Sequence, residues 1–141
     1  MINSKDLRIG NIYKTNVEFV GSLEAKINVF KDKSFFVLTE KNLILILQFD
    51  LLAFIEPIKL TDEILEQIGA VKINNADFEF NDGLIITHSG DFEFYLTYYY
   101  NDGRGEKSLG KLFYKYLHEI QNLYKTLQGT ELPININTLK V

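Results

Sequence analysis

Short apolar runs separated by polar turn residues fill the first third of the chain. The runs are rich in β-branched and aromatic residues, and Gly-Asn, Gly-Ser, Lys-Asp-Lys and Glu-Lys-Asn lie between them, a pattern typical of strands joined by tight turns. The predicted strands cover residues 8–13, 17–20, 25–30, 35–39 and 43–49. The last run does not alternate between apolar and polar residues, so we expect it to be the central strand of the sheet, covered on both faces. The pattern predicts an antiparallel β-meander or partial small barrel.

Hydrophobic spacing then changes twice. Pro57 ends the strand region, and residues 61–69 have helical spacing, with Thr61 as the N-cap and Gly69 as the stop. From residue 71 to 100 the period returns to two, with Asp82-Gly83 as a hairpin turn. We therefore expect a short helix followed by a three-stranded antiparallel segment.

The last third carries an amphipathic helix pattern. Apolar residues recur at i, i+3, i+4 and i+7 from Leu109 to Leu127, and Gly129 follows as a C-terminal glycine. This spacing predicts a long C-terminal helix. Residues 132–136 are expected to form a short final strand or a strap along the body.

The fold class that follows is α+β, in a single domain over residues 1–141. Residues 1–58 are its β-rich part, and residues 61–141 hold the helix, the hairpins and the C-terminal helix. The composition is that of an ordinary globular protein, with 46% hydrophobic and 24% charged residues. The N-terminus has no signal-peptide pattern and the apolar run at 43–55 is too short to span a bilayer, so we expect a cytoplasmic protein.

Catalytic and metal-binding patterns are missing from the sequence. The chain has no cysteine, which excludes a thiolate nucleophile and a thiolate zinc site. His88 and His118 lack metal-ligand spacing, Ser89 lies in a plain turn, and no phosphate-binding glycine loop occurs. We expect no enzyme, no metal and no cofactor. Alternating acidic residues such as Asp77 and Glu79 could bind the metal of a metal-dependent hydrolase or nuclease. The same alternation is also typical of a strand with one solvent-exposed face.

Two polar surfaces are candidate binding sites. Tyr98 and Tyr100 lead into a Gly-containing loop that holds Arg104 and Lys107, so aromatic faces and cations gather where they could stack a nucleotide or anchor a protein. An ordinary aromatic ladder ending in a loop has the same pattern. On the helical wheel, His118 points away from the apolar stripe. That places it on an exposed, weakly basic face suited to an anionic ligand or partner, or on a plain solvated face.

Three stretches carry a resemblance: residues 6–11 (Asp-Leu-Arg-Ile-Gly-Asn), 55–61 (Ile-Glu-Pro-Ile-Lys-Leu-Thr) and 116–124 (Tyr-Leu-His-Glu-Ile-Gln-Asn-Leu-Tyr). Their order and spacing resemble a family of small proteins encoded by bacteriophages, prophages and related mobile elements. Lys59 replaces a proline of the family pattern, and Gln128 stands where threonine is usual. Within the third stretch His118, Gln121 and Asn122 are polar, and we take them as candidate contact residues.

The resemblance implies a context but no activity. In the cytoplasm of a bacterial host, a small phage-type protein without catalytic apparatus is expected to bind a host protein or to sequester a nucleotide-type signal, as a counter-defence factor. A homo-oligomer is compatible with this reading. The alternative is a nucleic-acid-associated module, which the net charge of −4 disfavours.

Overall fold

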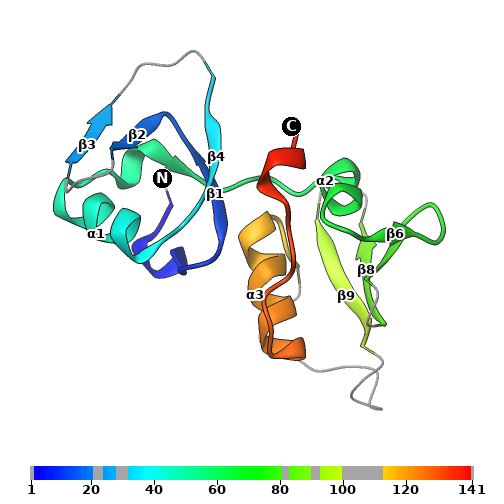
Figure 1. Ribbon diagram of the computed structural model, residues 1–141. Helices are drawn as coiled ribbons and strands as arrows, with labels where there is room; N and C mark the ends of the chain where they lie inside the picture. The colour runs from blue at the N-terminus through cyan, green and yellow to red at the C-terminus, as the bar shows by residue number, and fades with distance from the viewer. Residues whose placement is uncertain are drawn as a thin grey trace.

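The computed structural model describes residues 2–20, 24–27, 32–80, 83–89, 93–99 and 113–140. They form an N-terminal lobe (residues 2–56) and a C-terminal lobe (residues 57–140), which lie side by side (Figure 1). Each lobe contains antiparallel strands and helices, so the predicted α+β class is confirmed. Along the described ranges, no helix has the length and apolar character needed to cross a membrane.

The N-terminal lobe is built on a three-stranded antiparallel sheet with the order β4-β1-β5. Its strands are β1 (Ile12–Thr15), β4 (Ser34–Val37) and β5 (Ile55–Glu56), while β2 (Val17–Val20) pairs with β3 (Glu24–Ile27) in a separate ladder. The first strand begins later than predicted, because Gly10 turns the chain with a φ of 95°. Single 3-10 turns lie at η1 (Ser4–Asp6) and η2 (Leu52–Phe54).

The prediction of a central strand at residues 43–49 is wrong. This segment belongs to α1 (Glu40–Gln48), whose N-cap Thr39 accepts a hydrogen bond at its Oγ1 from the Asn42 N–H at 3.2 Å. A run of leucine and isoleucine fits a buried strand by hydrophobicity alone, but leucine also favours helices and the cap decides the outcome. The helix buries Leu45 and Ile46 on one side and exposes Ile44 and Leu47 on the other.

The C-terminal lobe holds a four-stranded antiparallel sheet with the order β6-β7-β8-β9. Its strands are β6 (Val71–Lys72), β7 (Asp77–Phe80), β8 (Leu84–His88) and β9 (Phe94–Tyr99), so β6 adds one strand to the three that were predicted. The predicted hairpin between β7 and β8 is confirmed, with Gly83 at a φ of 78°. The short helix α2 (Asp62–Gln67) is also confirmed, and Thr61 caps it through the Ile64 N–H at 3.1 Å.

The C-terminal helix α3 (Leu117–Gln128) is shorter than the apolar stripe suggested. Before the helix begins, Tyr114 exchanges two backbone hydrogen bonds with Phe94 of β9. The apolar stripe around Tyr114 therefore pairs with the edge of the sheet and is not helical. Gly129 ends the helix with a φ of 76°, as predicted. Beyond it the chain runs back along α3 as a strap (Figure 1), with a 3-10 turn η4 (Ile136–Thr138) and no strand in the described part.

β1 links the two hydrophobic cores, because neighbouring side chains on a strand point to opposite faces. Ile12 packs into the core of the C-terminal lobe, and Tyr13 packs into the core of the N-terminal lobe. β4 repeats the arrangement with Phe35 and Phe36. The boundary between the lobes therefore passes through this sheet and the facing side of α3.

Candidate functional site

A polar network crosses the boundary between the lobes, and Arg8 is at its centre. Its Nη1 and Nη2 donate to the two Glu131 carboxylate oxygens at 2.6 and 2.9 Å, a bidentate pair. Its Nε donates to Asn122 Oδ1 at 2.6 Å, and Nη2 also donates to Asn11 Oδ1 at 2.7 Å. The hydrogen bonds from Arg8 hold the pKa of Glu131 below its ordinary value. Arg8 thus ties α3 and the C-terminal strap to the start of β1.

Two amides of α3 complete the network. The Gln121 side chain is 2% exposed, and its Oε1 accepts the Ile12 N–H at 2.8 Å. Asn122 Oδ1 also accepts a hydrogen bond from Asn11 Nδ2 at 2.8 Å. A Gln at this position therefore satisfies a backbone donor of β1 that the helix would otherwise cover.

The segment before α2 joins the same boundary. Lys59 and Tyr116 form an antiparallel bridge, with Leu117 N–H donating to Ile58 O and Leu60 N–H donating to Lys115 O, both at 2.8 Å. The three stretches at 6–11, 55–61 and 116–124 therefore meet at one place. Four of their polar residues form hydrogen bonds across the boundary between the lobes: Arg8, Asn11, Gln121 and Asn122.

His118 is not exposed, contrary to the prediction. It is 5% exposed, because the polar face of α3 packs against the N-terminal lobe instead of solvent. Its ring stacks on Tyr116 at 5.8 Å between centroids and contacts Tyr13 at 5.3 Å. Gln121 is buried for the same reason, and Asn122 is half-buried. A helical wheel shows which face of a helix is polar, but it does not show what covers that face.

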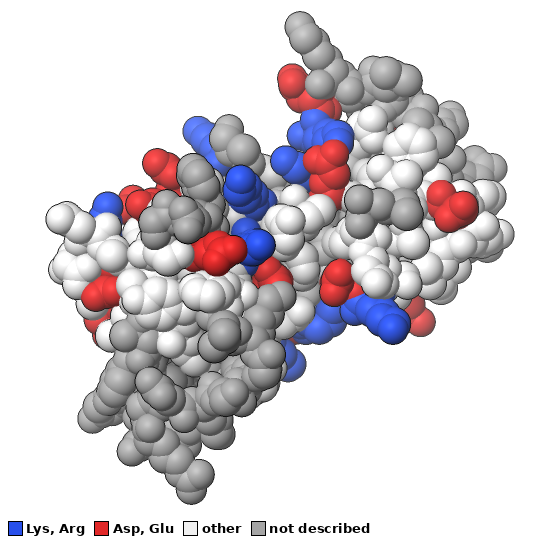
Figure 2. Space-filling view, turned by 180° about the vertical axis from the view of Figure 1, so that it is seen from behind, with Lys and Arg blue, Asp and Glu red and all other residues white. Residues whose placement is uncertain are grey.

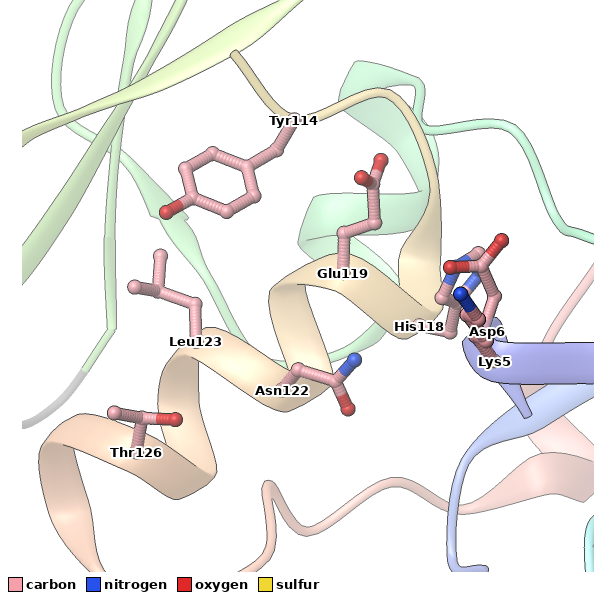
Figure 3. Close-up of a pocket in the computed structure, with 8 residues that line it drawn as sticks. All are labelled: Lys5, Asp6, Tyr114, His118, Glu119, Asn122, Leu123 and Thr126. Carbon is pink, nitrogen blue, oxygen red and sulfur yellow. The ribbon is translucent and has the colours of Figure 1, made fainter. Parts of the chain in front are cut away.

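Two cavities open beside the network, and we call them together the inter-lobe groove. The first, of about 300 Å³, is lined by Lys5, Asp6, His118, Glu119, Asn122 and Thr126, with Tyr114 and Leu123 at one end (Figure 3). The second, of about 500 Å³, extends past Asn3, Ala53, Glu56 and Tyr116. Asp6, His118 and Glu119 line both. The groove thus joins η1 of one lobe to α3 of the other.

The groove carries fixed charges. Glu119 Oε1 accepts the backbone N–H groups of Lys115 and Tyr116 at 2.9 and 3.0 Å, which anchors its carboxylate at the start of α3. Glu56 pairs with Lys33 and, at 3.8 Å, with Lys14, and the hydrogen bond from Lys33 lowers the pKa of Glu56. On the rear face, Lys and Arg side chains gather next to Asp and Glu at the waist between the lobes (Figure 2).

The predicted tyrosine and cation cluster lies mostly outside the described residues. Tyr98 belongs to β9, where its backbone pairs with Ile85, but its side chain is not described. Tyr100, Arg104 and Lys107 lie outside the described ranges. Whether these four side chains meet stays a prediction.

Asp77, one of the acidic residues considered for a metal, is engaged within the sheet. Asp77 accepts hydrogen bonds from Thr87 and Asn74, both at 2.6 Å, and the bond from Thr87 is the main cause of a lowered pKa of Asp77. His88 Nδ1 lies 2.9 Å from Asp62 Oδ1, and its ring stacks on Phe94. Across the described ranges, no three His, Asp or Glu side chains converge as a metal site would require.

Sequence reasoning missed the parts of this site that come from the N-terminal lobe and from the C-terminal strap. Lys5 and Asp6 line the groove, and Arg8, Asn11 and Glu131 form the network beside it. Asp6, Arg8 and Asn11 lie in the quoted stretches, together with the amide partners Gln121 and Asn122, whereas Lys5 and Glu131 lie outside them. Pairing them requires contacts across more than a hundred residues, which local periodicity does not encode.

Comparisons with family models, curated proteins and solved structures found no match to this chain.

Proposed function

We propose that the chain is a non-enzymatic binding protein that holds a host protein in the inter-lobe groove. The observation that carries the proposal is the meeting of two cavities at Asp6, His118 and Glu119, on the boundary between the lobes. Concave sites between packed units are where ligands and partner segments bind most often. The resemblance to phage and mobile-element proteins supports a role in counter-defence within the bacterial cytoplasm.

The fixed walls of the inter-lobe groove support a binding function over a catalytic one. The network residues Arg8, Gln121 and Asn122 are engaged in hydrogen bonds within the chain, so they fix the walls of the groove. A wall held in place before binding lowers the entropy cost of association. The groove is therefore suited to bind a partner segment whose shape is already complementary to it.

Two described lysines near α3 are engaged within the chain, which favours a protein partner over nucleic acid. Lys115 pairs with Glu93 at 3.2 Å, and Lys125 donates to Gly129 O at 3.2 Å. Lysines engaged in this way contribute less to a phosphate track, and the net charge of −4 opposes one. Nucleotide sequestration depends on Tyr98, Tyr100, Arg104 and Lys107 and remains a separate prediction.

The test is capture of a partner from bacterial lysate with variants that fill the groove. Thr126 is exposed and lines the first cavity, so Thr126→Trp obstructs it with little demand on the fold. Thr130→Trp is the matched control, because Thr130 is also exposed but lines neither cavity. We expect wild type and Thr130→Trp to retain the same host protein, at constant stoichiometry by native mass spectrometry, and Thr126→Trp to lose it. Equal retention by all three proteins, or no retained protein with wild type, would contradict the proposal.

A further inference from the structure

We infer that a second copy of the chain packs on the outer face of the four-stranded sheet, as two sheets pack in a β-sandwich. The outer face is the side of β6–β9 turned away from α3 and the strap, which pack with Phe78 and Phe94 on the inner side (Figure 1). The inference goes beyond the proposed function and concerns a different surface, because η1 and α3 line the inter-lobe groove.

Backbone pairing brings one row of side chains across this whole face. The row begins at Ile73, whose N–H donates to Asp77 O at 2.9 Å. Asp77 pairs with Thr87 of β8, which in turn pairs with Tyr95 of β9. Phe113 ends the row beside Tyr95, with their ring centroids 6.3 Å apart. Residues opposite one another on antiparallel strands point to the same face, so these five side chains lie side by side.

The outer face carries more apolar surface than a solvated sheet face does. An antiparallel sheet with one solvated face usually alternates apolar inward residues with polar outward ones. Here Val71 and Ile85 both pair with Glu79 and form a second row beside the first. Four large apolar side chains of the two rows are 37–59% exposed: Val71, Ile73, Tyr95 and Phe113. A contiguous apolar patch of this kind is typical of a protein interaction surface.

The order of residues in the first row suits a twofold arrangement. β8 is the third of the five segments that the row crosses. A twofold axis along β8 therefore places Ile73 of one copy opposite Phe113 of the other. Asp77 then lies opposite Tyr95, whose hydroxyl group can donate a hydrogen bond to a carboxylate. Apolar ends of the row cover apolar ends, so the face is complementary to itself.

The same arrangement keeps the negative charges of the two copies apart. Asp77 and Glu79 both lie on β7, one strand away from the axis. With strands about 4.8 Å apart and packed sheets about 10 Å apart, the two β7 strands are separated by roughly 14 Å. This exceeds the Debye length of about 8 Å at physiological salt, so their repulsion is weak. At the end of the face, Glu93 is paired with Lys115 at 3.2 Å.

The size of the face indicates how tightly two copies associate. Five segments about 4.8 Å apart, each about five residues long, give a face of roughly 20 Å by 15 Å. Two pleated faces of this size bury on the order of 1,000 Å², which is the lower end for a specific interface. We therefore expect a reversible dimer that dissociates on dilution.

The experiment is sedimentation velocity of the protein from about 1 µM to about 1 mM, with matched lysine variants. We expect wild type to change from monomer to dimer over this range. Ile73→Lys should weaken the dimer by at least about tenfold, because association would bury an unpaired charge. Ile44→Lys is the matched control, since Ile44 of α1 is 47% exposed and Ile73 is 48% exposed. A wild-type monomer at every concentration, or equal weakening by both variants, would overturn the inference.

Chemical cross-linking tests the twofold arrangement itself. The chain has no cysteine, so a single-cysteine variant reports on one position. An equal mixture of Ile73→Cys and Phe113→Cys should be cross-linked by a short bis-maleimide, because the two positions face each other. Ile73→Cys alone should not be, because its two copies lie at opposite edges of the interface. Equally fast cross-linking of Ile73→Cys alone would show that the copies do not pack in this way.

Discussion

The two lobes are stabilised in different ways. The core of the C-terminal lobe draws on the four-stranded sheet, on both of its helices and on the strap, and it includes the fully buried Phe78 and Phe94. The N-terminal lobe has a smaller core around Tyr13, Leu38 and Ile46. Small cores bury less apolar surface and leave less stability. The N-terminal lobe is held in position by Ile12 and Phe35, which pack into the larger core, and by a polar network. The network joins Arg8, Asn11 and the Ile12 N–H to Gln121 and Asn122 of α3 and to Glu131 of the strap.

This difference explains why polar residues gather at the boundary. An apolar contact tolerates sliding, whereas hydrogen bonds have direction and length and fix one arrangement. A groove formed by residues of two lobes keeps its shape only if the lobes keep their relative position. Under the proposed function, the network keeps the shape of the groove that lies beside it, and Asn122 of the network also lines the first cavity.

The largest expected effects come from the cores. Phe78→Ala leaves a cavity in the larger core and should lower the free energy of unfolding by about 3–5 kcal/mol. Ile46→Ala should cost about 2–4 kcal/mol, and hydrogen exchange should accelerate more in residues 32–56 than in the sheet of the C-terminal lobe. Urea unfolding and exchange on both variants would check this. Uniform acceleration across both lobes in Ile46→Ala would contradict the distinction between the cores.

A smaller effect is expected within the network. Gln121→Leu keeps the side-chain volume but leaves the buried Ile12 N–H without its acceptor, which should cost about 1–3 kcal/mol. Gln121→Glu restores an acceptor and shows whether the oxygen is what matters. Urea unfolding of the two variants measures the difference. If Gln121→Leu is as stable as wild type, Gln121 does not help to join the lobes.

The smallest effect is a pH dependence at Glu131. Arg8 lowers the pKa of this carboxyl below its ordinary 4.5, so the pair stabilises the fold above about pH 4.5 and the contribution is lost as the pH falls through the lowered pKa. Because both side chains are partly exposed, Glu131→Gln should cost under about 1 kcal/mol at pH 7. Thermal unfolding from pH 7 to pH 3 should show the gap to wild type closing on acidification. A gap that stays constant would show that the ionised carboxylate contributes nothing.

The sequence predicts most elements with local signals and fails chiefly where a distant contact decides. Thr61 and Gly83 have the expected roles, because a helix cap and a hairpin glycine act within a few residues. The segment at 43–49 is a local failure: it has the hydrophobicity of a buried strand, yet the Thr39 cap starts a helix there. The face of His118 is a failure through a distant contact, because it looks like a solvated surface until the N-terminal lobe covers it.

The candidate site was predictable only in part. His118 and Asn122 were chosen for their polarity, and both line the first cavity, yet Asn122 also binds Arg8 and Gln121 has a structural bond to β1. Asp6 carries no pattern that separates it from other exposed acidic residues. Its role depends on η1 lying against α3, and that contact exists only in the folded chain.

The most direct test of the central claim is hydrogen exchange of the captured complex, compared with the free protein. The account predicts added protection at residues 3–6, 53–57 and 116–126, which form the groove, and unchanged exchange on the exposed side of α1. Protection confined to residues 98–107, or to α1, would contradict it and place the binding surface elsewhere.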